Sequence, residues 1–407
     1  MRIQRPEPSD DRQKSRPSGR DFGTRTPELL AALRDAAGDR GWVTFSTYMD
    51  LALFHPSAGY YARLSTVGAK GDFATSPSLS PSFGKLFARQ FRQIWKAMGS
   101  PDRFDLVELG PGAGQFAEAA LTEIARDSRF LKAVSYVLVE RSTRLRETQA
   151  ERLAPWSPRV RWSDTIAQVA PDGIRGVIFS NEFFDALPCH RLEQTPEGLR
   201  EVAVAVGGDR LVETLVPVTD PRLASAIAAD GLTLTPGQRV EVSLAALDAM
   251  TEIAQALSAG VAITVDYGDL AREIYSPRRM AGTVRGYFRH MHVADPYARP
   301  GEQDLTYDVN FTALARTGEG AGLSTLGLRP QGDVLRHLGL DDEIKALRRG
   351  KSPMEADLAS APLEKLADPR SMGEGFKVLF QGKGLRADQL AGLGGSPLPA
   401  SRWPFFR

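Results

Sequence analysis

Short apolar segments alternate with helical segments from Asp105 onward, and this alternation constrains the fold more than any other feature of the chain. The apolar segments lie at residues 106–109, 136–140, 160–162, 176–180 and 260–265. A strand of a parallel sheet is covered by helices on both faces, so its sequence is apolar almost throughout. Apolar strands separated by helices therefore predict an α/β fold built on a mostly parallel, doubly wound, Rossmann-like sheet.

The remaining segments are expected to surround this sheet. Helix-start signals at Thr26 and Thr44 and an amphipathic segment at 83–98 predict helices before the sheet. Alternating apolar residues within about 190–240 predict an antiparallel excursion. The expected boundaries are 1–25 for a disordered tail, 26–100 for an N-terminal helical cap with a covering loop, 101–268 plus 372–390 for the core, and 269–371 for an inserted substrate-binding domain.

The composition argues against several classes of function. The chain has 407 residues, a formal net charge of +1 and one cysteine. A charge so near zero argues against a general nucleic-acid or membrane-surface binder, which needs a basic surface. The histidines lack the spacing of zinc ligands, so no metal is expected. Residues 1–25 contain acids that a mitochondrial transit peptide lacks, so the expected location is cytoplasmic. The sequence leaves open whether the chain forms a homodimer.

A glycine-rich turn after the first apolar strand is the sharpest indication of a ligand. Glu108 is followed by Gly110, Gly112 and Gly114, between a predicted strand and a predicted helix. Glycines there allow a tight turn and a close approach of a ligand to the backbone. The G-x-G-x-G spacing differs from the dinucleotide fingerprint G-x-G-x-x-G, and the Glu108 carboxylate suits a cation. S-adenosylmethionine carries an ammonium and a sulfonium, so we expect it here; the alternative is a tight turn without a ligand.

Polar residues at the ends of the later strands extend this predicted cofactor site. Glu140 ends the second strand, where Rossmann-like folds place an acid on ribose hydroxyls. Asp164 follows the third strand and is expected either to accept from the adenine amine or to cap the helix near Ile166. Asn181 follows the fourth strand, at the sheet edge where α/β folds bind ligands. Asp72, in the N-terminal segment, is expected to cover the cofactor.

Several segments, in order along residues 40–385, resemble the MidA-like methyltransferases. The most specific is the sequence Asn-Glu-Phe-Phe-Asp-Ala-Leu-Pro at 181–188, and the others lie at 59–61, 71–77, 107–112, 266–268, 282–285, 300–306 and 372–379. This family includes a mitochondrial complex I assembly factor that methylates a protein arginine. The resemblance implies a class I methyltransferase fold, S-adenosylmethionine as cofactor and methyl transfer as the reaction.

The chain departs from the family pattern at four positions. Ser78 and Lys85 stand where the family usually has acids, and Asp308 and Asn310 replace a His and an Asp. A guanidinium is bound best by carboxylates in bidentate geometry, so lost acids bear on the methyl acceptor. The cofactor half of the resemblance therefore transfers more completely than the acceptor half.

The loop after the fourth strand carries the expected catalytic residues. If the acceptor is a guanidinium, Glu182 and Asp185 are expected to hold it and to direct one nitrogen at the methyl group. Asp266, at the end of the fifth strand, is expected to assist. The alternative for these acids is a capping or turn-stabilising role.

Two further expectations concern residues outside that loop. The aromatic residues Tyr60, Tyr61 and Phe73 either shield the reaction from water or belong to the core. Arg285 and Asp304 are expected to pair structurally within the inserted domain. Neither expectation adds a catalytic group to the site.

Three classes of function stay open on these features, and a fourth is disfavoured. The first is methylation of a protein arginine, and the second is methylation of a small molecule at oxygen or nitrogen, which the lost acids make credible. The third is a non-catalytic, cofactor-binding assembly factor. A nicotinamide dehydrogenase is disfavoured because the glycine spacing is wrong and no hydride-relay His or Lys stands out. The methyl acceptor, protein or small molecule, is the main open question.

Overall fold

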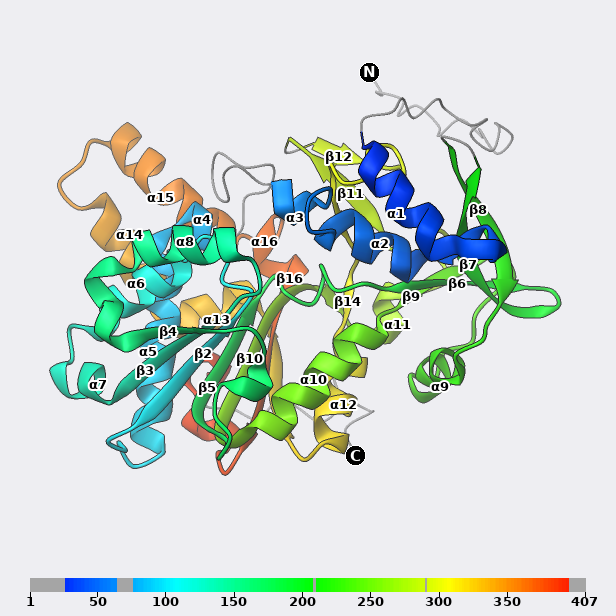
Figure 1. Ribbon diagram of the computed structural model, residues 1–407. Helices are drawn as coiled ribbons and strands as arrows, with labels where there is room; N and C mark the ends of the chain where they lie inside the picture. Colours follow the sequence, from blue (N-terminus) through cyan, green and yellow to red (C-terminus); the bar gives the residue numbers. More distant parts are fainter. Residues whose placement is uncertain (1–25, 64–75, 208–209, 290, 395–407) are drawn as a thin grey trace, which may run out of the picture.

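A large mixed sheet lies at the centre of the computed structural model, which describes residues 26–63, 76–207, 210–289 and 291–394 (Figure 1). The strand order is β15-β16-β10-β5-β2-β3-β4, and β14 pairs with the end of β10. The bounds are β2 Phe104–Leu109, β3 Val134–Val139, β4 Val160–Ser163, β5 Ile174–Asn181, β10 Leu257–Asp269, β14 Val309–Asn310, β15 Ser324–Pro330 and β16 Phe376–Lys383. The predicted α/β fold with a mostly parallel sheet is confirmed.

The strand order places a ligand-binding edge between β2 and β5. Strands β2, β3, β4, β5 and β10 run parallel to one another, whereas β16 is antiparallel to β10 and to β15. The chain moves outward from β2 through β3 and β4, and then returns to the other side of β2 as β5. Open α/β sheets bind ligands outside the carboxyl ends of the strands at such a reversal. Leu109 and Ser180 are paired at this edge.

Two strands of the main sheet, β14 and β15, lie inside the region expected to be an insertion. β15 pairs antiparallel with β16, so part of 269–371 belongs to the core. Helix α12 (Phe311–Gly320) precedes β15, and Leu314 and Leu328 share one apolar cluster. β15 is an edge strand in which Gly327 and Leu328 are the buried residues. It therefore lacks the continuous apolar sequence that marks the central strands.

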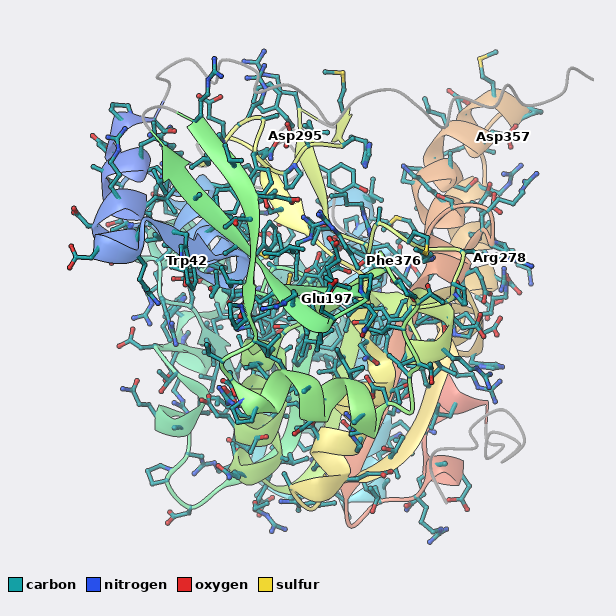
Figure 2. All side chains as sticks on the ribbon, turned by 90° about the vertical axis from the view of Figure 1, so that its right-hand side faces the viewer. Trp42, Glu197, Arg278, Asp295, Asp357 and Phe376 are labelled. Atoms are coloured by element: carbon teal, nitrogen blue, oxygen red, sulfur yellow. The ribbon has the colours of Figure 1, made fainter. Side chains whose placement is uncertain are left out.

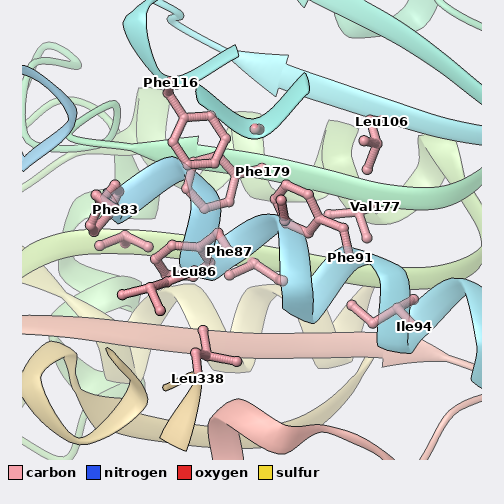
Figure 3. Packing of buried hydrophobic residues seen from close by; sticks show 14 of the residues in the cluster. Phe83, Leu86, Phe87, Phe91, Ile94, Leu106, Phe116, Val177, Phe179 and Leu338 are labelled. Carbon is pink, nitrogen blue, oxygen red and sulfur yellow. The ribbon is translucent and has the colours of Figure 1, made fainter. Parts of the chain in front are cut away.

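Helices cover both faces of the main sheet. On one face, α5 (Pro81–Ala97) and α6 (Gln115–Ile124) pack on the strands through an aromatic cluster (Figure 3). Phe116 of α6 stacks on Phe179 of β5, with 4.2 Å between ring centroids. On the other face, α10 (Leu244–Ala256) and α12 pack against β5 and β10. Full burial of one such side chain stabilises the fold by about 1.5–3 kcal/mol. The packing on both faces therefore holds β5 and β10 in place.

An antiparallel sheet beside the main sheet carries the first helices of the chain. Its order is β1-β7-β6-β9, and β8 also pairs with β7. The bounds are β1 Trp42–Thr44, β6 His190–Thr195, β7 Gly198–Gly207, β8 Arg210–Pro217 and β9 Arg239–Val242. Helices α1 (Pro27–Ala37) and α2 (Phe45–Phe54) pack on it, as Figure 1 shows in blue. The range 26–100 is thus divided, because α1 and α2 cover this sheet and α5 covers the main sheet.

A small sheet and further helices complete the described structure. The sheet has the order β12-β11-β13, with β11 at Arg285–Phe288, β12 at Met291–Val293 and β13 at Asp304–Thr306. The other α-helices are α3 Tyr60–Arg63, α4 Ser76–Leu79, α7 Ser128–Ala133, α8 Thr143–Arg152, α9 Pro221–Ala229, α11 Ala271–Ile274, α13 Gln331–His337, α14 Leu340–Arg348, α15 Pro353–Ala367 and α16 Met372–Gly375. Figure 2 shows Trp42 of β1 and Asp357 of α15 on opposite sides of the view. Within the described ranges, each helix is too short or too polar to span a bilayer.

Candidate active site

The turn at the end of β2 has a left-handed backbone at its three glycines. Gly110, Gly112 and Gly114 have φ angles of 61°, 54° and 79°. Any residue with a Cβ atom costs roughly 1–2 kcal/mol in this conformation, which explains the glycines. A Cβ added to Gly110 would lie 3.0 Å from Cδ2 of Phe183, in the loop after β5. The turn after β2 and the loop after β5 are therefore in direct contact.

Glu108 lies just before this turn and is buried. Its Oε2 accepts a hydrogen bond of 2.7 Å from the Tyr136 hydroxyl of β3. Burial raises the pKa of Glu108 to about 8, although the Tyr136 hydrogen bond lowers it. A nearby cation favours the ionised form of such a carboxyl group. These properties fit the expected position of Glu108 beside a positively charged cofactor.

Gln149 of α8, which the sequence predictions did not include, connects the ends of several strands. Its Nε2 donates to the Gly112 carbonyl oxygen at 2.7 Å and to Glu140 Oε2 at 3.5 Å. Its Oε1 accepts from Trp162 Nε1 at 2.8 Å. The other Glu140 oxygen accepts from the Ser142 amide at 2.8 Å, so Glu140 is fixed beside the glycine turn. Gln149 is the one buried residue of α8, so no apolar stripe marked it as facing inward.

Asp164 lies at the surface beyond β4. Arg146 Nη2 donates to its Oδ1 at 2.6 Å, and Arg146 Nε donates to the Glu140 carbonyl oxygen at 2.7 Å. The N-cap position of the short helix at Ile166 is occupied by Thr165, so the alternative of Asp164 as a helix cap is wrong. Its contact with an adenine stays a prediction. Two other residues of the sequence predictions, Asp72 and Phe73, lie outside the described residues.

The loop after β5 presents Glu182 in a strained conformation. Glu182 has a φ of 50°, and its amide donates to the Val265 carbonyl oxygen at 2.9 Å. Left-handed backbone at a residue other than glycine costs about 1–3 kcal/mol and is concentrated at functional sites. Its Oε1 accepts from the Ser76 amide at 3.1 Å and from Asn181 Nδ2 at 3.0 Å. Its Oε2 is buried and has no hydrogen-bond partner among the described residues, so it is available to a ligand.

Asp266 holds the same loop from β10. Its Oδ2 accepts from the amides of Phe184 at 3.0 Å and Asp185 at 3.3 Å, and its Oδ1 accepts from the Tyr267 amide at 3.0 Å. Both oxygens are thus engaged by backbone, and these contacts indicate a positioning residue rather than the expected catalytic one. Asp185, in contrast, has a buried Oδ1 without a partner among the described residues. Asp266 therefore holds the loop backbone at Phe184 and Asp185 in place.

Burial and mutual repulsion raise the pKa values of the acids at this edge. Burial raises the pKa of Glu182 to about 8, and the charge of Asp185 contributes. Burial raises the pKa of Asp185 to about 6, offset in part by the Tyr267 hydroxyl and the Arg285 guanidinium. The pKa of Asp266 also lies well above its usual value, because of burial and both neighbouring acids. A cation would favour ionisation of all these groups, so this edge suits a positively charged acceptor.

Tyr61 and Asp304 bring another acid to the same edge. The Tyr61 hydroxyl of α3 donates to Asp304 Oδ1 of β13 at 3.3 Å, and the charge of Asp304 further raises the pKa of Glu182. The expected pairing of Arg285 with Asp304 is wrong, because Arg285 Nη1 donates to Asp308 Oδ1 at 2.7 Å. Tyr61 and Asp304 are 243 residues apart, and nothing in the sequence indicated that they meet.

The four departures from the family pattern have different surroundings. Asp308 forms ion pairs with two arginines. Asn310 caps α12 by accepting from the Ala313 amide at 3.0 Å. Ser78 lies in α4 and Lys85 in α5. Asp308 and Asn310 thus have structural roles that account for the residues found there.

Comparisons with known proteins identify relatives of this chain. The family model of S-adenosyl-L-methionine-dependent methyltransferases matches residues 86–329. The protein arginine methyltransferase NDUFAF7, mitochondrial, of Mus musculus is 33% identical over 364 residues, which are 83% of this chain and 80% of that protein. The Homo sapiens protein of the same name is 33% identical over 362 residues, which are 83% of this chain and 79% of that protein.

A solved structure is also similar to this chain. The chain is similar to a COG1565 superfamily member from Burkholderia thailandensis, crystallised with bound S-adenosyl-homocysteine. The two chains are 31% identical with a TM-score of 0.78, and the match covers 89% of this chain and 94% of that one. The chain therefore belongs to the family of S-adenosyl-L-methionine-dependent methyltransferases whose model matches it from α5 to β15.

Proposed function

We propose that this methyltransferase acts on the guanidinium group of a protein arginine. The observation that carries the proposal is the pair of buried, unpartnered carboxylate oxygens, Glu182 Oε2 and Asp185 Oδ1, at the carboxyl edge of β5. Buried acids without partners are costly, and a guanidinium is the side chain best suited to neutralise and hydrogen-bond two of them. The relatives from Mus musculus and Homo sapiens, which carry the name protein arginine methyltransferase, support the same acceptor.

The residues around the glycine turn fit the cofactor. Gly110, Gly112 and Gly114 leave the backbone open to a ligand, and Glu140 is held beside them by Gln149. Glu108, Asp164, Asn181 and Asp72 complete the residues that we assign to its binding. S-adenosylmethionine, when bound, would supply an electrophilic methyl group on a sulfonium, and the electron pair of the broken carbon–sulfur bond would remain on sulfur as the neutral thioether.

Glu182 and Asp185 then orient and deprotonate the acceptor. Their free oxygens accept N–H bonds from the guanidinium and fix one terminal nitrogen in line with the methyl group. The transfer releases one proton from that nitrogen, and a carboxylate with a raised pKa is suited to accept it. The pKa values of about 8 for Glu182 and about 6 for Asp185 meet this requirement. Asp266 keeps Asp185 in place through the loop backbone, and the Val265 carbonyl oxygen holds the Glu182 amide.

A labelling experiment tests the acceptor. The protein is incubated with cell lysate and S-adenosylmethionine that carries an isotopically labelled methyl group, and labelled products are identified by mass spectrometry. We expect methylarginine in protein hydrolysates, and we expect Glu182→Gln to abolish the label while it binds the cofactor normally. A matched control is Glu302→Gln, because Glu302 is half-buried before β13 and pairs with Arg299 rather than with the candidate site.

Each alternative gives a different result. Label that is confined to small molecules would overturn the arginine proposal in favour of an O- or N-methyltransferase of small molecules. No label anywhere, with intact cofactor binding, would favour a non-catalytic assembly factor. Full labelling by Glu182→Gln would remove Glu182 from the mechanism.

A further inference from the structure

The first strand residue of β13 is a buried acid that the proposed mechanism does not use. Asp304 is 5% exposed and Thr306 is 1% exposed. Side chains two residues apart in a strand point to the same face of the sheet. The Thr306 hydroxyl oxygen is buried without a hydrogen-bond partner in the described part of the chain. This face of β13 therefore carries the Asp304 carboxyl group and, beside it, the Thr306 hydroxyl, which is available to a ligand.

Tyr61 fixes Asp304 near the loop after β5. Its hydroxyl donates to Asp304 Oδ1 at 3.3 Å, and its ring stacks on Phe54 with 5.3 Å between centroids. The charges of Asp304 and Asp185 both raise the pKa of Tyr61, and that of Asp304 also raises the pKa of Glu182. The Tyr307 hydroxyl, directly after β13, donates to the Phe184 carbonyl oxygen at 2.8 Å. The end of β13 therefore lies against the loop that carries Glu182 and Asp185, although the acids come from the main sheet edge and from the small sheet.

A second set of buried groups lies on the β10 side of the same edge. Tyr267 is 7% exposed, and its hydroxyl lies beside the Asp185 carboxyl group, whose pKa it lowers. Its ring is covered by the Arg285 guanidinium at 4.7 Å. The buried hydroxyls of Thr306 and Tyr267 thus belong to the strands that bring the acids to this edge, as expected for a site that a polar ligand completes.

The number of donors on a guanidinium exceeds what the loop after β5 offers. An arginine side chain has five N–H donors in one plane. Glu182 Oε2 and Asp185 Oδ1 are two acceptor atoms, and in a buried site each unmatched donor weakens binding. An additional acceptor within reach of the same group would match more of these donors, and a carboxylate forms the strongest such hydrogen bonds.

We infer that Asp304 is a direct contact of the acceptor cation and that it selects a guanidinium over a neutral group of the same shape. This inference rests on the proposed function and names the residue that sets acceptor specificity. Tyr61 is a positioning residue, because it contacts Asp304 through its hydroxyl. The site thus joins residues of the main sheet, α3 and the small sheet around one ligand.

The experiment measures binding of two small probes to the protein saturated with S-adenosylhomocysteine. The probes are ethylguanidinium and its neutral isostere N-ethylurea, and affinity is measured by NMR titration. We expect the wild type to prefer ethylguanidinium, and Asp304→Asn to lose at least ~10-fold of that affinity. Asp304→Glu should keep the preference, and Tyr61→Phe should weaken it by less than Asp304→Asn. Glu302→Gln, two residues before Asp304, is the matched control and should behave as wild type.

The outcomes separate this inference from the proposed function. A wild type that binds both probes equally would overturn the guanidinium acceptor itself and this inference with it. A wild type that prefers ethylguanidinium, together with an Asp304→Asn variant of unchanged preference, would overturn only the role of Asp304. S-adenosylhomocysteine affinity within about twofold of wild type shows that a variant is folded. If Asp304→Asn does not fold, loss of the preference in Asp304→Glu, or unchanged affinity in Tyr61→Phe, would overturn the inference.

Discussion

Two glycine-to-alanine substitutions separate backbone strain from damage to the cofactor site. Gly110 and Gly99 are both left-handed, with φ angles of 61° and 86°. Each substitution by Ala should therefore lower the free energy of unfolding by roughly 1–2 kcal/mol. The surroundings differ, because a Cβ at Gly110 would lie 3.0 Å from Phe183 Cδ2, whereas a Cβ at Gly99 would have no heavy atom within 4 Å. The two variants should thus be similar in stability and different in cofactor binding.

The expected difference follows from what Phe183 touches. Phe183 must move by a few tenths of an ångström to accept a methyl group at Gly110, and Glu182 is its neighbour in the chain. We expect Gly110→Ala to weaken S-adenosylmethionine binding at least about tenfold, or about 1.4 kcal/mol, and Gly99→Ala to leave it unchanged. Urea unfolding measures stability, and isothermal titration calorimetry measures binding. Equal cofactor affinity in the two variants would refute the assignment of the glycine turn to the cofactor.

Three other predictions follow from the buried acids. Asp266→Asn should destabilise the fold by about 2–4 kcal/mol in urea unfolding, because its amide group cannot accept all three backbone bonds; an unchanged stability with lost activity would instead assign Asp266 a chemical role. Binding of S-adenosylmethionine at pH 7 should release a proton from Glu108, whose pKa is about 8, and calorimetry in buffers of different ionisation enthalpy should detect it in wild type but not in Glu108→Gln. Without ligand, the free energy of unfolding should fall as the pH rises from about 5 to 8. The pKa values of Glu108 and Glu182 are raised to about 8 in the folded state, so the folded state binds more protons over this range than the unfolded state does. A free energy of unfolding that rises over this range, measured by chemical denaturation, would contradict those values.

The sequence identified the strands that are covered on both faces. β2, β3, β5 and β10 are apolar almost throughout, because helices pack on each side of them. β15 was not predicted. It is an edge strand with one neighbouring strand and with both buried and exposed side chains, so its composition resembles that of a loop. The division of the N-terminal helices between two sheets also followed from tertiary packing, which no local pattern reports.

The candidate site was predictable where its residues are close in sequence. The glycine turn and the segment from Asn181 to Asp185 are continuous, so their motifs carried the signal. Gln149 was missed because its helix is otherwise polar, and the contact between Tyr61 and Asp304 joins residues 243 positions apart. Both Asp266 oxygens accept hydrogen bonds from backbone amides because of how the loop after β5 folds. An acid at the end of a strand fits a positioning role and a catalytic role equally well, so the sequence did not distinguish the two.

A crystal structure of the protein with S-adenosylhomocysteine and ethylguanidinium tests the central claim most directly. We predict that the amino-acid portion of S-adenosylhomocysteine lies against the glycine turn, with the ribose on Glu140, and that the guanidinium lies between the sulfur atom and the carboxylates of Glu182 and Asp185. A guanidinium bound elsewhere, or a sulfur atom that faces away from these two carboxylates, would contradict the account.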